Sequence, residues 1–103
     1  MPLPDSLHAF TTEFEAFDRA VSAEKGIRIE FSDPAPARAY RARLHQARVL
    51  DRRENRVAYK EGDPMYGRSS YDSLRVTIRE DTAGKHWVYI EKQENIPGTV
   101  EEL

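Results

Sequence analysis

The spacing of apolar residues changes along this chain, and the changes predict a succession of helices and strands. Residues 5–26, "DSLHAFTTEFEAFDRAVSAEKG", place apolar side chains at alternating steps of three and four, the spacing of one face of an α-helix. These side chains are Leu7, Phe10, Phe14, Phe17 and Val21. Asp5 or Ser6 can cap the start, and Gly26 suits the position after the end. We expect the stripe to pack on a sheet, with a dimer seam as the alternative.

A short strand and a second helix follow. In residues 26–31, "GIRIEF", apolar and charged side chains alternate, which predicts a strand with one buried face. Ser32 or Asp33 can then accept hydrogen bonds from free backbone N–H groups, and Pro34 suits the first turn of a helix. We expect this helix to continue to about Glu54.

The remaining segments predict a loop and a hairpin. Residues 55–73 contain two glycines and a proline without a sustained period, which indicates a long loop, with a possible short strand at 56–60. Residues 74–79, "LRVTIR", and 86–91, "HWVYIE", alternate as strands do. The connection "EDTAGK" supplies a glycine for the hairpin turn.

The order helix, strand, helix, loop, strand, strand predicts an α+β fold. We expect residues 1–103 to form one small sandwich-like domain, with two helices on one face of a mainly antiparallel sheet. Residues 1–4 and 95–103 are expected to be flexible ends.

Composition narrows the class of protein. The chain has 103 residues, of which 39% are hydrophobic and 33% charged, and this balance is typical of a folded domain. It contains no cysteine, so disulfides and thiolate metal sites are excluded. No basic and apolar leader and no long apolar run is present, so we expect a cytoplasmic protein without a membrane span.

The net charge of −2 hides a basic middle segment. Residues 26–79 hold twelve basic and seven acidic side chains, whereas both flanking segments are acidic. At 100° per residue, the basic side chains of the second helix fall in one stripe under about 90° wide that holds no acidic residue. The stripe consists of Arg38, Arg41, His45, Arg48, Arg52 and, if the helix extends that far, Arg56. An apolar stripe, with Tyr40, Leu44 and Ala47 at its centre, lies beside it.

Three interpretations of this basic stripe stay open. Like charges four residues apart repel each other, so helix stability alone does not explain them. A row of guanidinium groups can bind the phosphates of a nucleic acid, because arginine donates bidentate hydrogen bonds to phosphate oxygens. Alternatively, carboxylates of the first helix or of the acidic carboxy-terminal segment neutralise the stripe, within the chain or across a dimer, or the stripe is only solvated. The acids of the first helix in question are Glu13, Glu15, Asp18 and Glu24.

The sheet face turned away from the helices is predicted to be basic and aromatic. Alternation sends Arg75, Arg79, Trp87 and Tyr89 to this face, and Tyr66 of the loop is similar in character. Such residues can stack on unpaired bases, and they are equally typical of a protein interface.

The sequence offers no candidate catalytic or metal-binding residues. The histidines His8, His45 and His86 lie on different predicted elements, without a metal-binding spacing. No phosphate-binding glycine motif is present, and the serines near Asp72 lack a partner histidine pattern. We therefore expect a protein that is not an enzyme and that uses no cofactor.

Part of the chain resembles small uncharacterised proteins encoded by bacteriophages and prophages. The resemblance is carried by the strand "IRIEF", the helix "SDPAPARAYRARLHQAR" and the later "YDSLRVTI". Within these, the helix pattern uses Ala37, Arg41, Arg43, Leu44 and Arg48, and the strand pattern uses Tyr71, Asp72 and Leu74. The resemblance covers about the middle half of the chain. It implies a phage setting, hence the host cytoplasm, and no specific activity.

Together these features predict a non-enzymatic nucleic-acid-binding accessory or regulatory protein, acting on DNA or RNA. Its contacts would come from the basic stripe, supported by Arg75 and Arg79. The alternative is a protein-interaction module, either a phage protein that docks on a host or virion component or an obligate homodimer, with the arginines in interface salt bridges.

Overall fold

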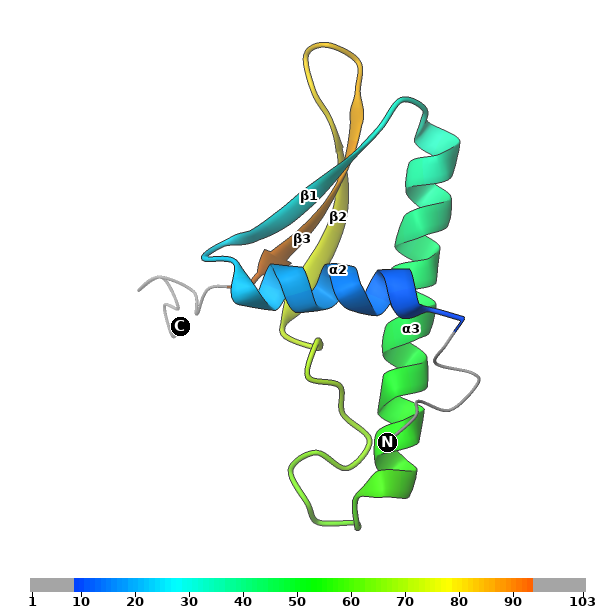
Figure 1. The fold of residues 1–103 in the computed structure, drawn as a ribbon, viewed down its shortest axis with the longest axis vertical. Coiled ribbons are helices and arrows are strands. Elements are labelled where there is room, and N and C mark those ends of the chain that lie inside the picture. Colours follow the sequence, from blue (N-terminus) through cyan, green and yellow to red (C-terminus); the bar gives the residue numbers. More distant parts are fainter. Residues whose placement is uncertain (1–8, 94–103) are drawn as a thin grey trace, which may run out of the picture.

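The computed structural model describes residues 9–93, which form two helices and a three-stranded sheet (Figure 1). In chain order the elements are α2 (Thr11–Ser22), β1 (Gly26–Phe31), α3 (Pro34–Ala58), β2 (Leu74–Glu80) and β3 (His86–Lys92). The predicted α+β order of helix, strand, helix, strand, strand is confirmed. The ends of the chain, with the predicted caps Asp5 and Ser6, Leu7 and the segment 95–103, lie outside the described residues.

The sheet is antiparallel, with β3 in its centre and the order β1-β3-β2. Two rows of apolar residues cross all three strands, Ile27–Ile90–Val76 and Ile29–Val88–Ile78. Both rows face the helices, because the alternating residues of each strand share one face. The core therefore lies between this face and the helices, and its largest fully buried side chains are Phe17, Leu44, Val88 and Ile90.

The two helices cover the same sheet face in different directions. In Figure 1, α3 runs along the length of the molecule and α2 runs across it. The small residues Ala37 and Ala47 of α3 are fully buried beside Leu44, which confirms the predicted apolar stripe of this helix. The other face of the sheet is left uncovered by α2 and α3.

The buried face of α2 differs from the predicted stripe. Phe17 is fully buried, and Phe10 and Phe14 pack at the margin of the core, but Val21 is 45% exposed. The most buried side of the helix instead carries Ala16 and Ala20 beside Phe17, and the acidic Glu13 is buried there as well. The helix is rotated toward its alanines because small side chains allow a closer approach to the neighbouring elements.

Two predicted boundaries were wrong. Gly26 begins β1 as predicted, but it is not the residue directly after the first helix, which ends at Ser22 with Ala23 as its C-cap. Gly26 adopts a φ of +123°, and a Cβ there would collide with the carbonyl oxygen of Ile90. The close pairing of β1 with β3 is therefore what requires glycine at this position.

The second helix is longer than predicted. It continues to Ala58 instead of stopping near Glu54, so the possible strand at 56–60 is absent and the loop covers 59–73. Pro34 occupies the first turn as predicted, and Asp33 is the N-cap residue, although its side chain makes no capping hydrogen bond. No helix-breaking residue occurs after Pro36 until Gly62, so the helix can propagate past residue 54.

The hairpin of β2 and β3 is confirmed. Gly84 has a φ of +81°, as its turn requires. Asp81 stabilises this turn, because its carboxylate accepts hydrogen bonds from the backbone N–H groups of Ala83 and Lys85 at 2.9 and 3.0 Å.

Candidate functional site

The side chains of the basic stripe on α3 differ in how deeply they are buried. Arg48 is only 8% exposed, Arg41 and Arg52 are half-buried, and His45 and Arg38 are exposed. The gradient follows from helix geometry, since at 100° per residue Arg48 lies closest to the apolar stripe. The stripe therefore divides into side chains used inside the fold and side chains that face solvent.

Arg48 is used inside the fold. Its Nη1 donates hydrogen bonds to the backbone carbonyls of Tyr71 and Leu74 at 3.0 and 2.7 Å, and its Nη2 lies 3.2 Å from Nδ1 of His45. Its guanidinium also lies 5.8 Å from the ring centroid of Phe17. These contacts hold the end of the loop against α3, so Arg48 is not available to a nucleic acid in this structure.

Arg52, one turn later in α3, also binds the loop. Its Nε donates to Oδ1 of Asp72 at 2.7 Å, and its Nη2 lies 2.5 Å from the same oxygen. The other Asp72 oxygen accepts the backbone N–H of Ser69 at 3.0 Å. Burial alone would raise the pKa of Asp72, but hydrogen bonds from Arg52 and Ser69, with the charges of Arg52 and Arg48, hold that pKa below its ordinary value.

Further contacts fix the loop 59–73 beside the carboxy-terminal half of α3. Ser69 donates through Oγ to Asp51 at 2.5 Å, and Asn55 donates through its side-chain amide to the carbonyl of Arg68. Gly67 lies directly against the side chain of Arg56. Figure 1 shows the loop running back along this half of the helix. We call this set of contacts the loop clamp.

The predicted internal neutralisation of the stripe involves a different acid from those named on the sequence. Asp72 of the loop pairs with Arg52, whereas Glu13 of α2 pairs with Arg43, at 2.6 Å, and Arg43 lies outside the stripe. The hydroxyl of Tyr71 donates to Asp18 at 2.5 Å. Within residues 9–93, Glu15 and Glu24 make no ion pair with the stripe.

The amino-terminal half of the stripe remains basic. Arg38 and Arg41 have no ion pair or side-chain hydrogen bond with any residue between 9 and 93. Burial, followed by the charges of Arg48, Arg41 and Arg52, lowers the pKa of His45 below its ordinary value. The positive charge of Arg38 and Arg41 is therefore not neutralised by an ion pair within the part of the chain that the structure describes.

The outer face of the sheet brings together the other predicted site residues. In register, Arg79 lies opposite Trp87, and Tyr89 lies between Arg28 and Thr77. Arg79 also pairs with Glu91 at 2.8 Å. Arg75 is exposed at the other end of β2. Tyr66, which is 37% exposed in the loop, makes no ring contact with Trp87 or Tyr89 among the residues described.

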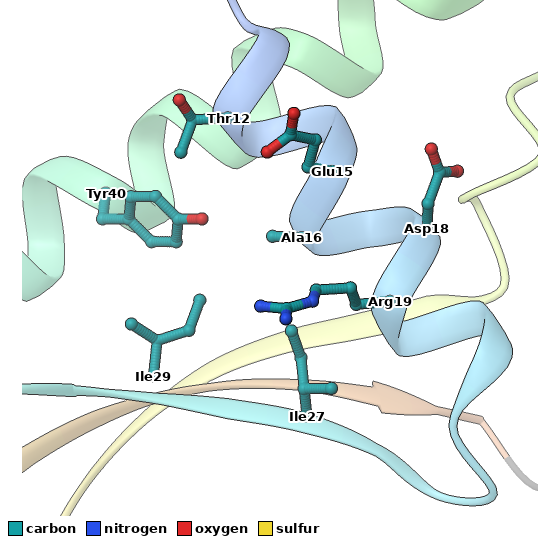
Figure 2. Close-up of a pocket in the computed structure, with 8 residues that line it drawn as sticks. All are labelled: Thr12, Glu15, Ala16, Asp18, Arg19, Ile27, Ile29 and Tyr40. Carbon is teal, nitrogen blue, oxygen red and sulfur yellow. The ribbon is translucent and has the colours of Figure 1, made fainter.

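A pocket of about 600 Å³ lies between α2, β1 and α3 (Figure 2). Ile27 and Ile29 of β1 line one side, and Arg19 and Glu15 line the side formed by α2. Figure 2 shows the hydroxyl of Tyr40 pointing into the space from α3. Burial, and then the charge of Glu13, raises the pKa of Tyr40, so its hydroxyl is a donor at neutral pH.

Sequence reasoning missed both the pocket and the loop clamp. The pocket combines residues of three elements, and its one sequence signal is the pair Ala16 and Ala20, whose spacing permits close approach of α2. The loop clamp had a stronger signal, because the polar Asp51 and Asn55 lie in line with the apolar stripe of α3.

Neither a metal cluster nor a spanning helix occurs between residues 9 and 93. No group of three or more histidine, cysteine or acidic residues there could hold a metal ion. No helix there is long and apolar enough to cross a membrane.

Comparison with known proteins identifies no relative of this chain. No protein-family model, curated protein or solved structure matches it. The resemblance to bacteriophage and prophage proteins accordingly stays a prediction, and the candidate site is described by its own geometry.

Proposed function

We propose that this protein is a non-enzymatic nucleic-acid-binding protein whose phosphate contacts come from the amino-terminal half of the α3 stripe. The observation that supports the proposal is the contrast within one helix. Arg48 and Arg52 are occupied by the loop clamp, whereas Arg38 and Arg41 have no partner among the described residues. Unpaired arginines that repel their neighbours have a physical reason to bind a polyanion.

The arginines of the loop clamp contribute indirectly. Asp72 forms an ion pair with Arg52, whereas the hydrogen bonds of Arg48 go to neutral carbonyl groups and its Nη2 lies beside His45. Arg48 therefore adds to the positive potential near Arg41 and His45 without contacting the ligand. We include the cytoplasmic location predicted from the sequence in this proposal.

The first prediction compares a double substitution with a single control substitution on α3. Replacing Arg38 and Arg41 with glutamine removes two phosphate contacts, so the dependence of log K on log salt should flatten by about two units. The measurement is fluorescence anisotropy of labelled single-stranded and duplex oligonucleotides at several salt concentrations.

Arg53→Gln is the matched control for this measurement. Arg53 is exposed on the same helix but lies outside the stripe, and it has no ion pair within residues 9–93. Its single charge removal should change the slope by less than one unit. If the slope changes equally per removed charge in the control and in the double variant, the attraction is nonspecific and the stripe is not the binding site. Absence of binding at low salt would also overturn the proposal.

Protein interaction is a second candidate, favoured by exposed valines on α3. Val57 is 83% exposed and Val49 is 46% exposed, and their spacing of eight residues places them about 80° apart, both on the side of the helix away from its apolar stripe. Sedimentation at increasing protein concentration tests self-association, and loss of a dimer in the Val49→Ser, Val57→Ser variant would support it. A monomer at all concentrations would reject the homodimer.

A further inference from the structure

The outer face of the sheet has the arrangement of a stacking platform. Trp87 and Tyr89 both come from β3, the central strand, and the flanking strands supply Arg28 on one side and Arg79 on the other. The helices cover the opposite face, so this face is open to solvent, with Arg28 and Arg79 exposed and the two rings partly exposed. The platform is thus aromatic along its centre and basic along both edges.

The two flanking arginines lie over the faces of the rings. The guanidinium carbon of Arg28 lies 4.0 Å from the ring centroid of Trp87, and that of Arg79 lies 4.3 Å from the ring centroid of Tyr89. Arg28 also donates to the Tyr89 hydroxyl at 3.2 Å. Unpaired bases stack on guanidinium planes as well as on aromatic rings, so a base can stack on the outer side of each arginine–aromatic pair.

The acidic groups at the platform already have partners within the protein. Glu30 pairs with Lys85 at 2.5 Å, Glu91 pairs with Arg79 at 2.8 Å, and Asp81 accepts the indole N–H of Trp87 at 2.7 Å. Arg28 and Arg75 have no carboxylate partner among the described residues. The charge left over on this face is therefore positive, which is complementary to phosphate.

A hollow beside Tyr89 provides a place for one base. It has a volume of about 290 Å³ and lies at the edge where β1 begins, lined by Lys25, Arg28, Tyr89 and Glu91. Lys25 and Arg28 are cations that can bind the adjoining phosphates, and Glu91 can accept a hydrogen bond from a base N–H group. One side of the hollow therefore suits a base and the other suits the backbone.

The spacing of the two rings selects unpaired bases. Residues two apart on a strand lie about 7 Å apart, whereas consecutive bases in a duplex are stacked at about 3.4 Å. Bases that have left a helical stack can occupy both rings, but paired bases keep their faces covered by their neighbours. The platform is thus suited to a single strand rather than to a duplex.

We propose that the outer face of the sheet binds the bases of single-stranded nucleic acid through Trp87, Tyr89 and the hollow beside Tyr89. This inference rests on the proposed function and extends it, because it names the form of the ligand and a second surface. It places base contacts on the sheet and phosphate contacts on the opposite side of the molecule, on α3, as well as at the platform edges.

The chain contains one tryptophan, so its fluorescence reports directly on this face. The experiment titrates the unmodified protein with a ten-nucleotide single strand and with a hairpin duplex of the same composition, following Trp87 emission and anisotropy of a label on the nucleic acid. We expect saturable quenching of Trp87 by the single strand and no quenching by the duplex.

A pair of tyrosine variants supplies the control. Tyr89→Leu keeps an apolar side chain but removes one stacking ring, so binding of the single strand should weaken by about five- to one-hundred-fold. Tyr59→Leu changes an exposed tyrosine after α3 and should leave affinity unchanged. Far-ultraviolet circular dichroism checks that each variant is folded. If Tyr89→Leu does not fold, Arg75→Gln tests the same face at an exposed side chain without a partner.

The outcomes separate the two proposals. Binding of either nucleic acid with unchanged Trp87 emission and no effect of Tyr89→Leu would overturn the platform and leave the α3 proposal standing. Stronger binding of the duplex than of the single strand would also overturn the platform. Absence of binding to both ligands at low salt would overturn both proposals.

Discussion

At the scale of single residues, arginines of the same helix have different roles in the structure. Arg48 is buried with its guanidinium hydrogen-bonded to two backbone carbonyls, while Arg38, ten residues earlier in the same stripe, faces solvent. A difference of about 80° around the helix separates the two positions, which is enough to move a side chain from the core margin to the surface. Position around α3 therefore decides whether an arginine stabilises the fold or is available for binding.

Arg48→Met tests this distinction by unfolding. The substitution keeps much of the apolar stem but removes the side-chain donor from the carbonyls of Leu74 and Tyr71, of which Tyr71 keeps the backbone N–H of Leu74, so the free energy of unfolding should fall by about 1–3 kcal/mol. Urea denaturation measures the loss. Arg53→Met, at an exposed position of the same helix, should change stability by less than about 0.5 kcal/mol. Similar values for both variants would contradict a structural role for Arg48.

At the scale of elements, the loop clamp makes the loop 59–73 part of the fold. The segment has no strand or helix of its own, yet its carboxy-terminal half is attached to α3 through Arg48, Arg52 and Asn55. A long loop ordinarily costs conformational entropy to order. The hydrogen bonds to arginine offset part of this cost, because charged donors form stronger hydrogen bonds than neutral ones.

The clamp should weaken in acid because of Asp72. Its pKa is lower in the fold than in the unfolded chain, so the unfolded state binds more protons as the pH falls. The contribution of Asp72 is complete above its unfolded pKa of about 3.9 and is lost as the pH falls through the folded pKa. The stability difference between the unmodified protein and Asp72→Asn should therefore be largest near pH 7 and shrink toward pH 3.

Urea denaturation at several pH values measures this trend. Glu61→Gln serves as the control at pH 7, because Glu61 is an exposed carboxylate of the same loop without a partner among the described residues, and it should change stability by less than about 0.5 kcal/mol. A stability difference for Asp72→Asn that stays constant from pH 7 to pH 3 would reject the proposed protonation of the clamp.

At the scale of the whole molecule, the edge strand β1 depends on one glycine. Gly26 has a φ of +123° and faces the backbone of Ile90 so closely that no side chain fits. Gly62 also has a positive φ, of +97°, but open space surrounds it. The two glycines thus share a backbone conformation disfavoured for other residues and differ in the contact with a neighbouring strand.

Comparison of Gly26→Ala with Gly62→Ala separates these two effects. Gly62→Ala should cost about 1–2 kcal/mol of stability, since only the backbone conformation is unfavourable. Gly26→Ala should cost about 3 kcal/mol or more, because the strand pairing must shift as well. Thermal or urea unfolding gives both values. Equal losses would show that the β1–β3 pairing does not depend on the absence of a side chain.

Local signals in the sequence were sufficient for the elements and for the two faces of the sheet. The alternation in 26–31, 74–79 and 86–91 predicts the three strands to within one residue of their observed ends, and the side of the sheet on which each residue lies, since a strand has a period of two whatever it packs against. Gly84 predicts the hairpin turn for the same local reason. Arg75, Arg79, Trp87 and Tyr89 could therefore be placed on one face in advance.

The tertiary structure decided the features that depend on contacts between distant segments. Helical periodicity could place six basic groups on one stripe, but only the path of the loop shows that Asp72 and the carbonyls of Tyr71 and Leu74 occupy Arg52 and Arg48. The rotation of α2 toward Ala16 and Ala20 likewise depends on how closely its neighbours approach. Local pattern fixes each element and its faces, whereas the partners of a side chain depend on packing between elements that sequence periodicity does not encode.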